Sequence, residues 1–100
     1  MTASRKEGIE MRAHIHVRGR VQGIFFRSNC ELVANSLGLK GWVRNLPDGR
    51  VEIMVEGGER EVNELMEWCH EGPRHAKVKE VDVEWLEAVG EFSSFRVLYW

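Results

Sequence analysis

The fold is decided by residues 19–27, Gly19-Arg20-Val21-Gln22-Gly23-Ile24-Phe25-Phe26-Arg27. Before this stretch, residues 13–18 alternate between apolar and polar side chains, which predicts a β-strand. After it, apolar residues at helical spacing predict a helix over residues 27–38, ending at Gly38. The stretch therefore joins the end of a strand to the start of a helix.

This junction has the chemistry of an anion site. The first N–H groups of a helix have no carbonyl partner within the helix and carry partial positive charge. Gly19 and Gly23 allow a ligand to approach the backbone, and Arg27 brings a cation to a helix end that disfavours one. A tight turn without a ligand explains the two glycines as well, so this stretch alone leaves both interpretations open.

A second motif follows the predicted helix. Residues 41–45, Gly41-Trp42-Val43-Arg44-Asn45, indicate another strand. Together, the two motifs resemble the acylphosphatase family, whose members carry a GRVQGVxFR loop and a GWVxN strand at this separation. Ile24 stands where the family usually has valine. Weaker matches extend the resemblance from about Ala13 to the C-terminus: Leu37-Gly38-Leu39, Leu46-Pro47-Asp48-Gly49 and Gly72-Pro73.

The rest of the pattern predicts further strands and a second helix. We expect strands over 41–46, 50–56 and 77–86, a helix over 59–70, and a final strand with Phe95, Val97 and Tyr99. Gly57-Gly58 is expected to end the third strand. The order βαββαβ, with an additional C-terminal strand, predicts a ferredoxin-like α+β sandwich with both helices on one face of a mainly antiparallel sheet. The acylphosphatase resemblance implies the same fold.

Composition narrows the class of protein. The chain has 100 residues, 43% of them hydrophobic and 30% charged, which suits one domain with its own core. We expect a flexible polar tail over 1–12, without the apolar segment of a secretory signal, and the acylphosphatase-like domain over 13–100. The formal net charge of −2 argues against a nucleic-acid partner, and no apolar run is long enough to span a membrane.

The resemblance implies a hydrolase that converts a small-molecule acyl phosphate into a carboxylate and inorganic phosphate, without a metal or another cofactor. Two cysteines without CxxC spacing favour a reducing, cytoplasmic compartment. Arg27 matches the family's phosphate-binding arginine, and Asn45 matches the asparagine that positions water. The phosphate-binding group is then Arg27 with the loop residues Gly19, Arg20, Val21, Gln22, Gly23, Ile24 and Phe25.

The predicted fold brings these groups together. Strand one and strand two run toward the same end of the sheet, and alternation places Asn45 on the same face as Val43. The loop, Arg27 and Asn45 should therefore meet. On spacing alone, an asparagine that bonds its own turn is the simpler interpretation of Asn45.

Three further groups of side chains lead to separate expectations. His14 and His16 share the strand face opposite the core, and two such ligands without a third predict a solvated face rather than a metal site. Cys30 and Cys69 are expected at the same end of two antiparallel helices, close enough for a disulfide, although buried free thiols are the norm in a reducing compartment. An apolar patch for weak self-association of an otherwise monomeric protein is expected from Trp42, Met54, Leu98 and Trp100, unless arginine and lysine stems cover it.

Other functions of this fold remain as alternatives. A non-catalytic module that binds an anion or a small ligand accounts for the sheet, but it gives no reason for Arg27 and Asn45 to converge. An RNA-recognition domain would stack bases on aromatic residues of its first and third strands, and neither predicted strand contains one. An acylphosphatase-like domain can also serve a larger pathway, such as carbamoyl-phosphate handling in a maturation protein.

Overall fold

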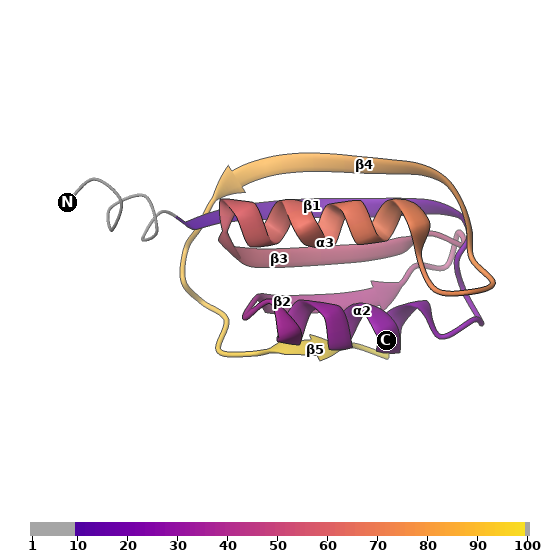
Figure 1. Cartoon of the computed structure of the whole chain (residues 1–100), viewed down its shortest axis with the longest axis horizontal. Helices are drawn as coiled ribbons and strands as arrows, with labels where there is room; N and C mark the ends of the chain where they lie inside the picture. The colour runs from indigo at the N-terminus through magenta and orange to yellow at the C-terminus, as the bar shows by residue number, and fades with distance from the viewer. Residues whose placement is uncertain (1–9, 100) are drawn as a thin grey trace.

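The structure, a computed structural model, describes residues 10–99. The elements are β1 (Glu10–Arg20), α2 (Phe26–Ser36), β2 (Lys40–Asn45), β3 (Val51–Gly58), α3 (Glu59–Glu71), β4 (Lys77–Glu87) and β5 (Phe95–Val97). The strands form one sheet in the order β4-β1-β3-β2-β5, and both helices lie on the same side of it (Figure 1). The predicted ferredoxin-like βαββαβ sandwich with an additional C-terminal strand is confirmed. No helix within the described range is long and apolar enough to cross a membrane.

The sheet is antiparallel except at one edge. β1 lies between β3 and β4, and β2 pairs with β3, all in antiparallel register. β5 pairs with β2 in parallel, from Gly41↔Phe95 to Val43↔Val97. This parallel pairing brings the C-terminal end of the chain beside the end of β2, where the second motif lies.

β1 is longer than predicted at its start. It begins at Glu10, which pairs with Gly58, so residues 10–12 belong to the sheet and not to the predicted tail. Residues 1–9, the rest of that tail, lie outside the described residues. The same pairing corrects the expected break at Gly57-Gly58, because both glycines continue β3 opposite Met11 and Glu10. Glycine has a weak propensity for strands, but pairing with β1 keeps both glycines in β3.

β1 also continues further toward the motif loop than predicted. The pairing with β4 shifts register between Arg18 and Gly19, and it then runs on to Arg20↔Lys77. Gly19 has φ of 128°, and a Cβ on it would lie 2.2 Å from the carbonyl oxygen of Lys77. Only glycine fits this irregularity. Gly19 and Arg20 therefore end the strand rather than begin the loop.

The core lies between the helices and the sheet. Ala13, Ile15 and Val17 of β1 are fully buried, and so are alternate residues of β3 and the predicted apolar faces of both helices. The helix residues are Phe26, Cys30 and Ala34 of α2 and Val62, Leu65 and Cys69 of α3. The helical periodicity read from the sequence is confirmed.

The face of the sheet away from the helices is less solvated than predicted. Glu52 and Glu56 of β3 are only 7% and 3% exposed. Each is paired, Glu52 with Arg44 (Nε–Oε1 2.6 Å) and Glu56 with Arg12 (Nε–Oε2 2.8 Å). β3 is flanked by β1 and β2, so side chains from both neighbours cover its outer face. Alternation along one strand does not reveal whether that strand is central.

The predicted apolar patch is partly covered. Trp42 and Met54 do stand opposite each other on this face, but both are half-buried, and the guanidinium carbon of Arg44 lies 5.2 Å from the centre of the Trp42 ring. Leu98 is also half-buried, and Trp100 lies outside the described residues. Self-association through this face stays a prediction.

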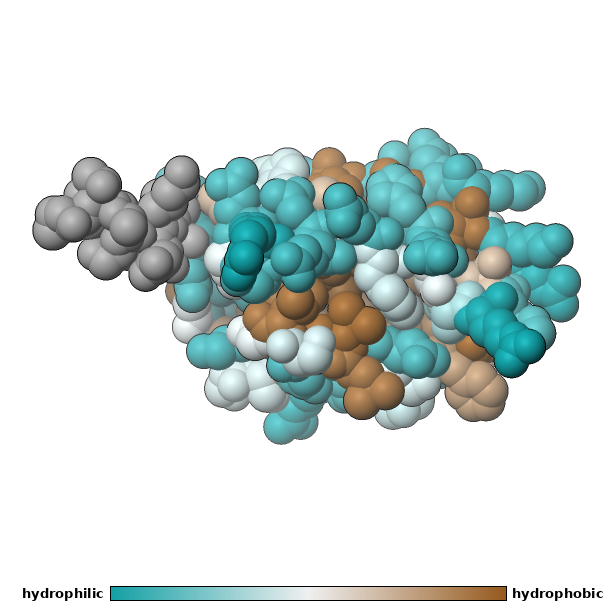
Figure 2. Space-filling model, in the orientation of Figure 1, coloured by the Kyte–Doolittle hydropathy of each residue, from teal (hydrophilic) through white to brown (hydrophobic). Residues whose placement is uncertain are grey.

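Exposed apolar residues lie elsewhere. On the helix side, hydrophilic residues cover α3, and hydrophobic ones gather over α2 (Figure 2). Among the large apolar residues described, the exposed ones are Phe25, Leu32, Trp85, Val89 and Tyr99. Phe25 and Tyr99 belong to the cavity described below.

The two cysteines are neighbours, as expected from the antiparallel helices. Cys30 and Cys69 are free thiols, and both are fully buried. A hydrogen-bonding contact with Cys69, together with burial, raises the pKa of Cys30 well above its ordinary value. The structure therefore holds the pair as two buried thiols in contact.

Candidate active site

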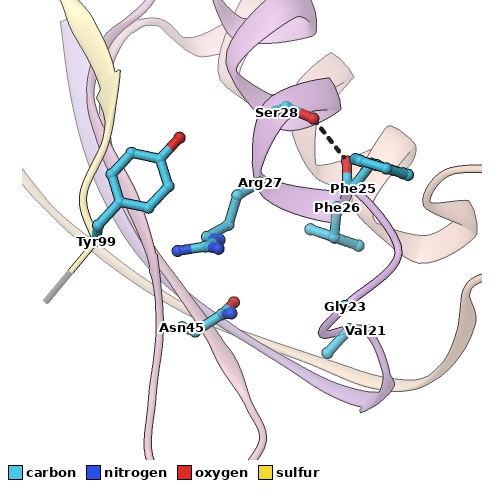
Figure 3. A pocket seen from close by; sticks show the side chains of 8 residues that line it. All are labelled: Val21, Gly23, Phe25, Phe26, Arg27, Ser28, Asn45 and Tyr99. Carbon is cyan, nitrogen blue, oxygen red and sulfur yellow. Dashed lines mark hydrogen bonds between the residues drawn. The ribbon is translucent and has the colours of Figure 1, made fainter.

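The chain turns sharply between β1 and α2. Phe25 precedes the helix with φ of 66°, the one positive φ at a non-glycine residue within 10–99. This left-handed conformation is uncommon for a bulky side chain. The Phe25 carbonyl oxygen accepts a hydrogen bond from Ser28 Oγ at 3.3 Å (Figure 3). It also accepts from Asn29 N at 3.1 Å and Asn29 Nδ2 at 2.8 Å, and the three bonds hold the turn.

The start of α2 is left open to an anion. In the described structure, no side chain caps this helix, and its first turn contains no acidic residue. Its first N–H groups therefore keep their partial positive charge for an external acceptor.

A cavity of about 220 Å³ opens at this helix start. It is lined by Val21, Gly23, Phe25, Phe26, Arg27, Ser28, Asn45 and Tyr99 (Figure 3). The motif loop, the first turn of α2, the end of β2 and the C-terminal segment thus share one cavity. The expectation that Arg27 and Asn45 meet at one end of the sheet is confirmed.

Arg27 is held in place by neutral groups. Its Nη1 donates to the Leu98 carbonyl oxygen at 3.4 Å, and its guanidinium carbon lies 4.8 Å from the centre of the Tyr99 ring (Figure 3). No carboxylate in residues 10–99 forms an ion pair with it. Its charge and most of its hydrogen-bond donors therefore remain for an anionic ligand.

Asn45 ends β2 opposite Val51, with its side-chain amide on the Arg27 side of the cavity (Figure 3). Its Oδ1 is buried and has no hydrogen-bond partner in the described structure. The oxygen is not bonded to its own turn, which was the simpler interpretation from sequence. An unpaired buried acceptor costs about 1–3 kcal/mol, so a ligand or water that donates to Oδ1 would be favoured.

Gln22 connects the loop to the neighbouring hairpin turn. Its Nε2 donates to the carbonyl oxygens of Leu46 and Arg50, each at 2.9 Å. These two residues flank the turn that follows Asn45. Gln22 therefore fixes the spacing between the loop and Asn45, and its side chain does not line the cavity.

The predicted phosphate-binding residues fall into two groups. Val21, Gly23, Phe25 and Arg27 line the cavity with Asn45. The others do not line it: Gly19 and Arg20 belong to β1, Gln22 bonds the hairpin, and Ile24 lies with Arg20 at a separate hollow beside residues 74–77. The sequence predicted a phosphate-binding role for the whole motif, whereas only some of its residues face the cavity.

Tyr99 was missed as a cavity residue. The sequence marks it only as an alternating position in a final strand. Its place beside Arg27 follows from the parallel pairing of β5 with β2, which no local pattern indicates. Phe26 and Ser28 flank Arg27 in the sequence, and both also line the cavity although the motifs did not mark them.

Comparisons with known proteins agree with the fold and the motifs. The acylphosphatase family model matches residues 13–97. An acylphosphatase of Rubrobacter xylanophilus is 52% identical over 98 residues, which cover 93% of this chain and 89% of the relative. An acylphosphatase structure from Coxiella burnetii has 41% identity and a TM-score of 0.86, covering 95% of this chain and 99% of the other. The acylphosphatase crystal structure from Bacillus subtilis has 35% identity and a TM-score of 0.86, covering 89% and 99%.

The chain thus combines a ferredoxin-like sandwich with an arginine at the open start of α2. By the family model and these relatives, the chain belongs to the acylphosphatase family, whose members are enzymes that hydrolyse acyl phosphates.

Proposed function

We propose that Arg27 and the open N-terminus of α2 hold the phosphoryl group of an acyl phosphate while Asn45 positions the attacking water. The observation that carries this proposal is one cavity that contains both the Arg27 guanidinium, which has no acidic partner among residues 10–99, and the unpaired Oδ1 of Asn45. The first can neutralise phosphate, and the second can accept a hydrogen bond from water.

The leaving group makes this small set of residues sufficient. A carboxylic acid has a pKa of roughly 4, so a carboxylate departs without a proton donor. The protein then has to supply positive charge beside the phosphate oxygens and a water in line with the bond that breaks. Arg27 and the backbone N–H groups supply the first, so the reaction is proposed to be independent of metal.

The proposed hydrolysis needs no side-chain base. The water oxygen bonds to phosphorus as the bond to the acyl oxygen breaks, and the carboxylate leaves with the electron pair. Asn45 is neutral and orients the water without taking its proton. A phosphate oxygen of the substrate takes that proton, which yields inorganic phosphate.

Benzoyl phosphate hydrolysis in the presence of a chelator tests the assignment. Asn45→Ala should lower kcat by about 100-fold or more, while inhibition by inorganic phosphate stays close to wild type. Arg27→Ala should lose both turnover and phosphate inhibition. Asn35→Ala, which removes an exposed asparagine of α2, is the matched control and should behave as wild type.

Two outcomes would count against the proposal. Nearly full activity in Asn45→Ala would remove the water-positioning role. Wild-type protein that binds phosphate but does not hydrolyse benzoyl phosphate would favour the alternative of an anion-binding module.

We further propose that the enzyme works as a monomer in the cytoplasm. Arg27, Asn45 and the start of α2 line one cavity within a single chain. Two buried free thiols suit a reducing compartment. Sedimentation velocity across a range of concentrations checks the monomer, and a dimer at micromolar concentration would contradict it.

A further inference from the structure

A cluster of metal-ligating side chains lies on the sheet face away from the helices. It consists of His14 and His16 of β1 and Glu52 of β3, whose ligand atoms all lie within 4.8 Å of one another. His14 Nε2 lies 2.6 Å from Glu52 Oε2, and His16 Nε2 lies 3.7 Å from the same oxygen. The proposed hydrolysis uses none of these groups.

The sheet register builds this cluster. His14 and His16 are two residues apart on one strand, so both point away from the core that Ala13, Ile15 and Val17 enter. His16 stands directly opposite Glu52 in the antiparallel pairing of β1 with β3. Sequence analysis found no third ligand because Glu52 is 36 positions beyond His16 in the chain, and only the strand order makes them neighbours.

We propose that His14, His16 and Glu52 form a binding site for a divalent transition-metal ion of the zinc class. Two imidazoles and one carboxylate are a ligand set that Zn²⁺ takes, with a water in the fourth position of its tetrahedron. Co²⁺, Ni²⁺ and Cu²⁺ share the preference for imidazole.

The spacing fits one ion with small side-chain rotations. Bonds of about 2.0–2.2 Å in a tetrahedron place neighbouring ligand atoms roughly 3.3–3.5 Å apart. The two distances to Glu52 Oε2, 2.6 and 3.7 Å, lie on either side of that value. The side chains are 24% exposed at His14, 23% at His16 and 10% at Glu52, so an ion can reach them from solvent.

Outer groups stand next to the ligands. Arg44 Nε donates to Glu52 Oε1 at 2.6 Å, and Oε2 is the oxygen that lies near both histidines. Oε1 of the exposed Glu84 lies 4.0 Å from His14 Nδ1, beyond hydrogen-bond distance but near the ring nitrogen opposite the ligating one. Such carboxylate–histidine–metal arrangements fix the imidazole tautomer and strengthen metal binding.

A bound ion would join β1 to β3, the middle strand of the sheet. It would stabilise the folded state in proportion to its concentration relative to Kd, and it would leave the cavity on the helix face unchanged. The site therefore predicts metal-dependent stability combined with chelator-resistant hydrolysis.

Calorimetric titration of the reduced protein with Zn²⁺ tests the site. Wild type should bind one ion with Kd of about 10 μM or tighter, and Tm should rise. The double variant His14→Ala/His16→Ala should weaken binding at least about 100-fold, since two of three ligands are gone. The double variant His70→Ala/His75→Ala removes two exposed histidines elsewhere and should bind as wild type.

A second measurement covers the case in which the double variant misfolds. Co²⁺ should give wild-type protein a visible absorption band without thiolate character, and the single variant His16→Gln should lose it while keeping the native circular dichroism. Glu84→Gln should weaken Zn²⁺ binding by about tenfold. Absence of saturable binding in wild type, or equal binding in His14→Ala/His16→Ala, would show that the cluster is an ion-pair network only.

Discussion

At the residue scale, Glu56 shows how one buried carboxylate organises a loop. It accepts hydrogen bonds from Arg12 Nε at 2.8 Å, Val89 N at 2.8 Å and Gly90 N at 3.1 Å. The connection between β4 and β5 is thereby tied to the centre of the sheet. The negative charge matches one cation and two backbone donors, so a neutral replacement cannot satisfy all three.

Glu56→Gln should lower the free energy of unfolding by roughly 3 kcal/mol, because Arg12 would lose its buried carboxylate partner and keep only the exposed Glu91. Urea denaturation measures this value. The control is Glu91→Gln, which removes the exposed carboxylate that lies 3.4 Å from the same arginine, and it should change stability by under about 0.5 kcal/mol.

The pH dependence follows from the same contacts. Burial acts to raise the pKa of Glu56, but hydrogen bonds from Val89, Arg12 and Gly90 outweigh it, so the folded pKa lies below the unfolded one. This contribution is therefore present above the unfolded pKa of about 4.3 and is lost as pH falls through the folded value. Wild type should lose more stability than Glu56→Gln between pH 5 and pH 3, and equal losses would contradict the assignment.

Residues within the motifs were the most predictable from sequence. Arg27 and Asn45 were singled out by their motifs, and both do line one cavity. Glu52, Glu56 and Tyr99 were not, because their surroundings come from strands far away in the chain. Local spacing indicates which side a residue faces, and it does not indicate what covers it.

At the scale of elements, Gln22 couples the motif loop to the β2–β3 turn. Gln22→Ala removes both hydrogen bonds to that turn, so the loop and Asn45 lose their fixed spacing. We expect kcat for benzoyl phosphate to fall by roughly 10- to 100-fold and stability to fall by about 1–2 kcal/mol.

Arg20→Ala is the matched comparison, because Arg20 belongs to the same motif but lies outside the cavity. It should keep activity within about twofold of wild type. A large loss in Arg20→Ala with little loss in Gln22→Ala would reverse the roles assigned to these residues.

The order and type of the elements were predictable, and their ends were less so. Apolar periodicity identified both helices and all five strands. The ends depend on partners: Gly57 and Gly58 stay in β3 because β1 pairs with them, and β1 runs to Arg20 because β4 does. Glycine, which usually signals a break, is here retained within paired strands.

At the scale of the whole molecule, the two cysteines lie where the two helices pack against each other. Cys30 of α2 and Cys69 of α3 are buried in contact. With the pKa of Cys30 raised well above its ordinary value, little reactive thiolate is present. A thiol reagent should therefore react slowly with the native protein and should find two thiols per chain after unfolding without reductant. Finding none would mean that the pair is oxidised to a disulfide.

The strand order also has a kinetic consequence. β1 is made first, yet its neighbours β3 and β4 begin at residues 51 and 77, so every contact of the first strand must close a long loop of chain. Such non-local topology favours folding over milliseconds to seconds rather than microseconds. Because Tyr99 lies beside Arg27 only when β5 has joined β2, the cavity is completed by the pairing of this parallel edge strand. During refolding, the return of catalytic turnover should then mark the end of assembly, later than the recovery of helical signal.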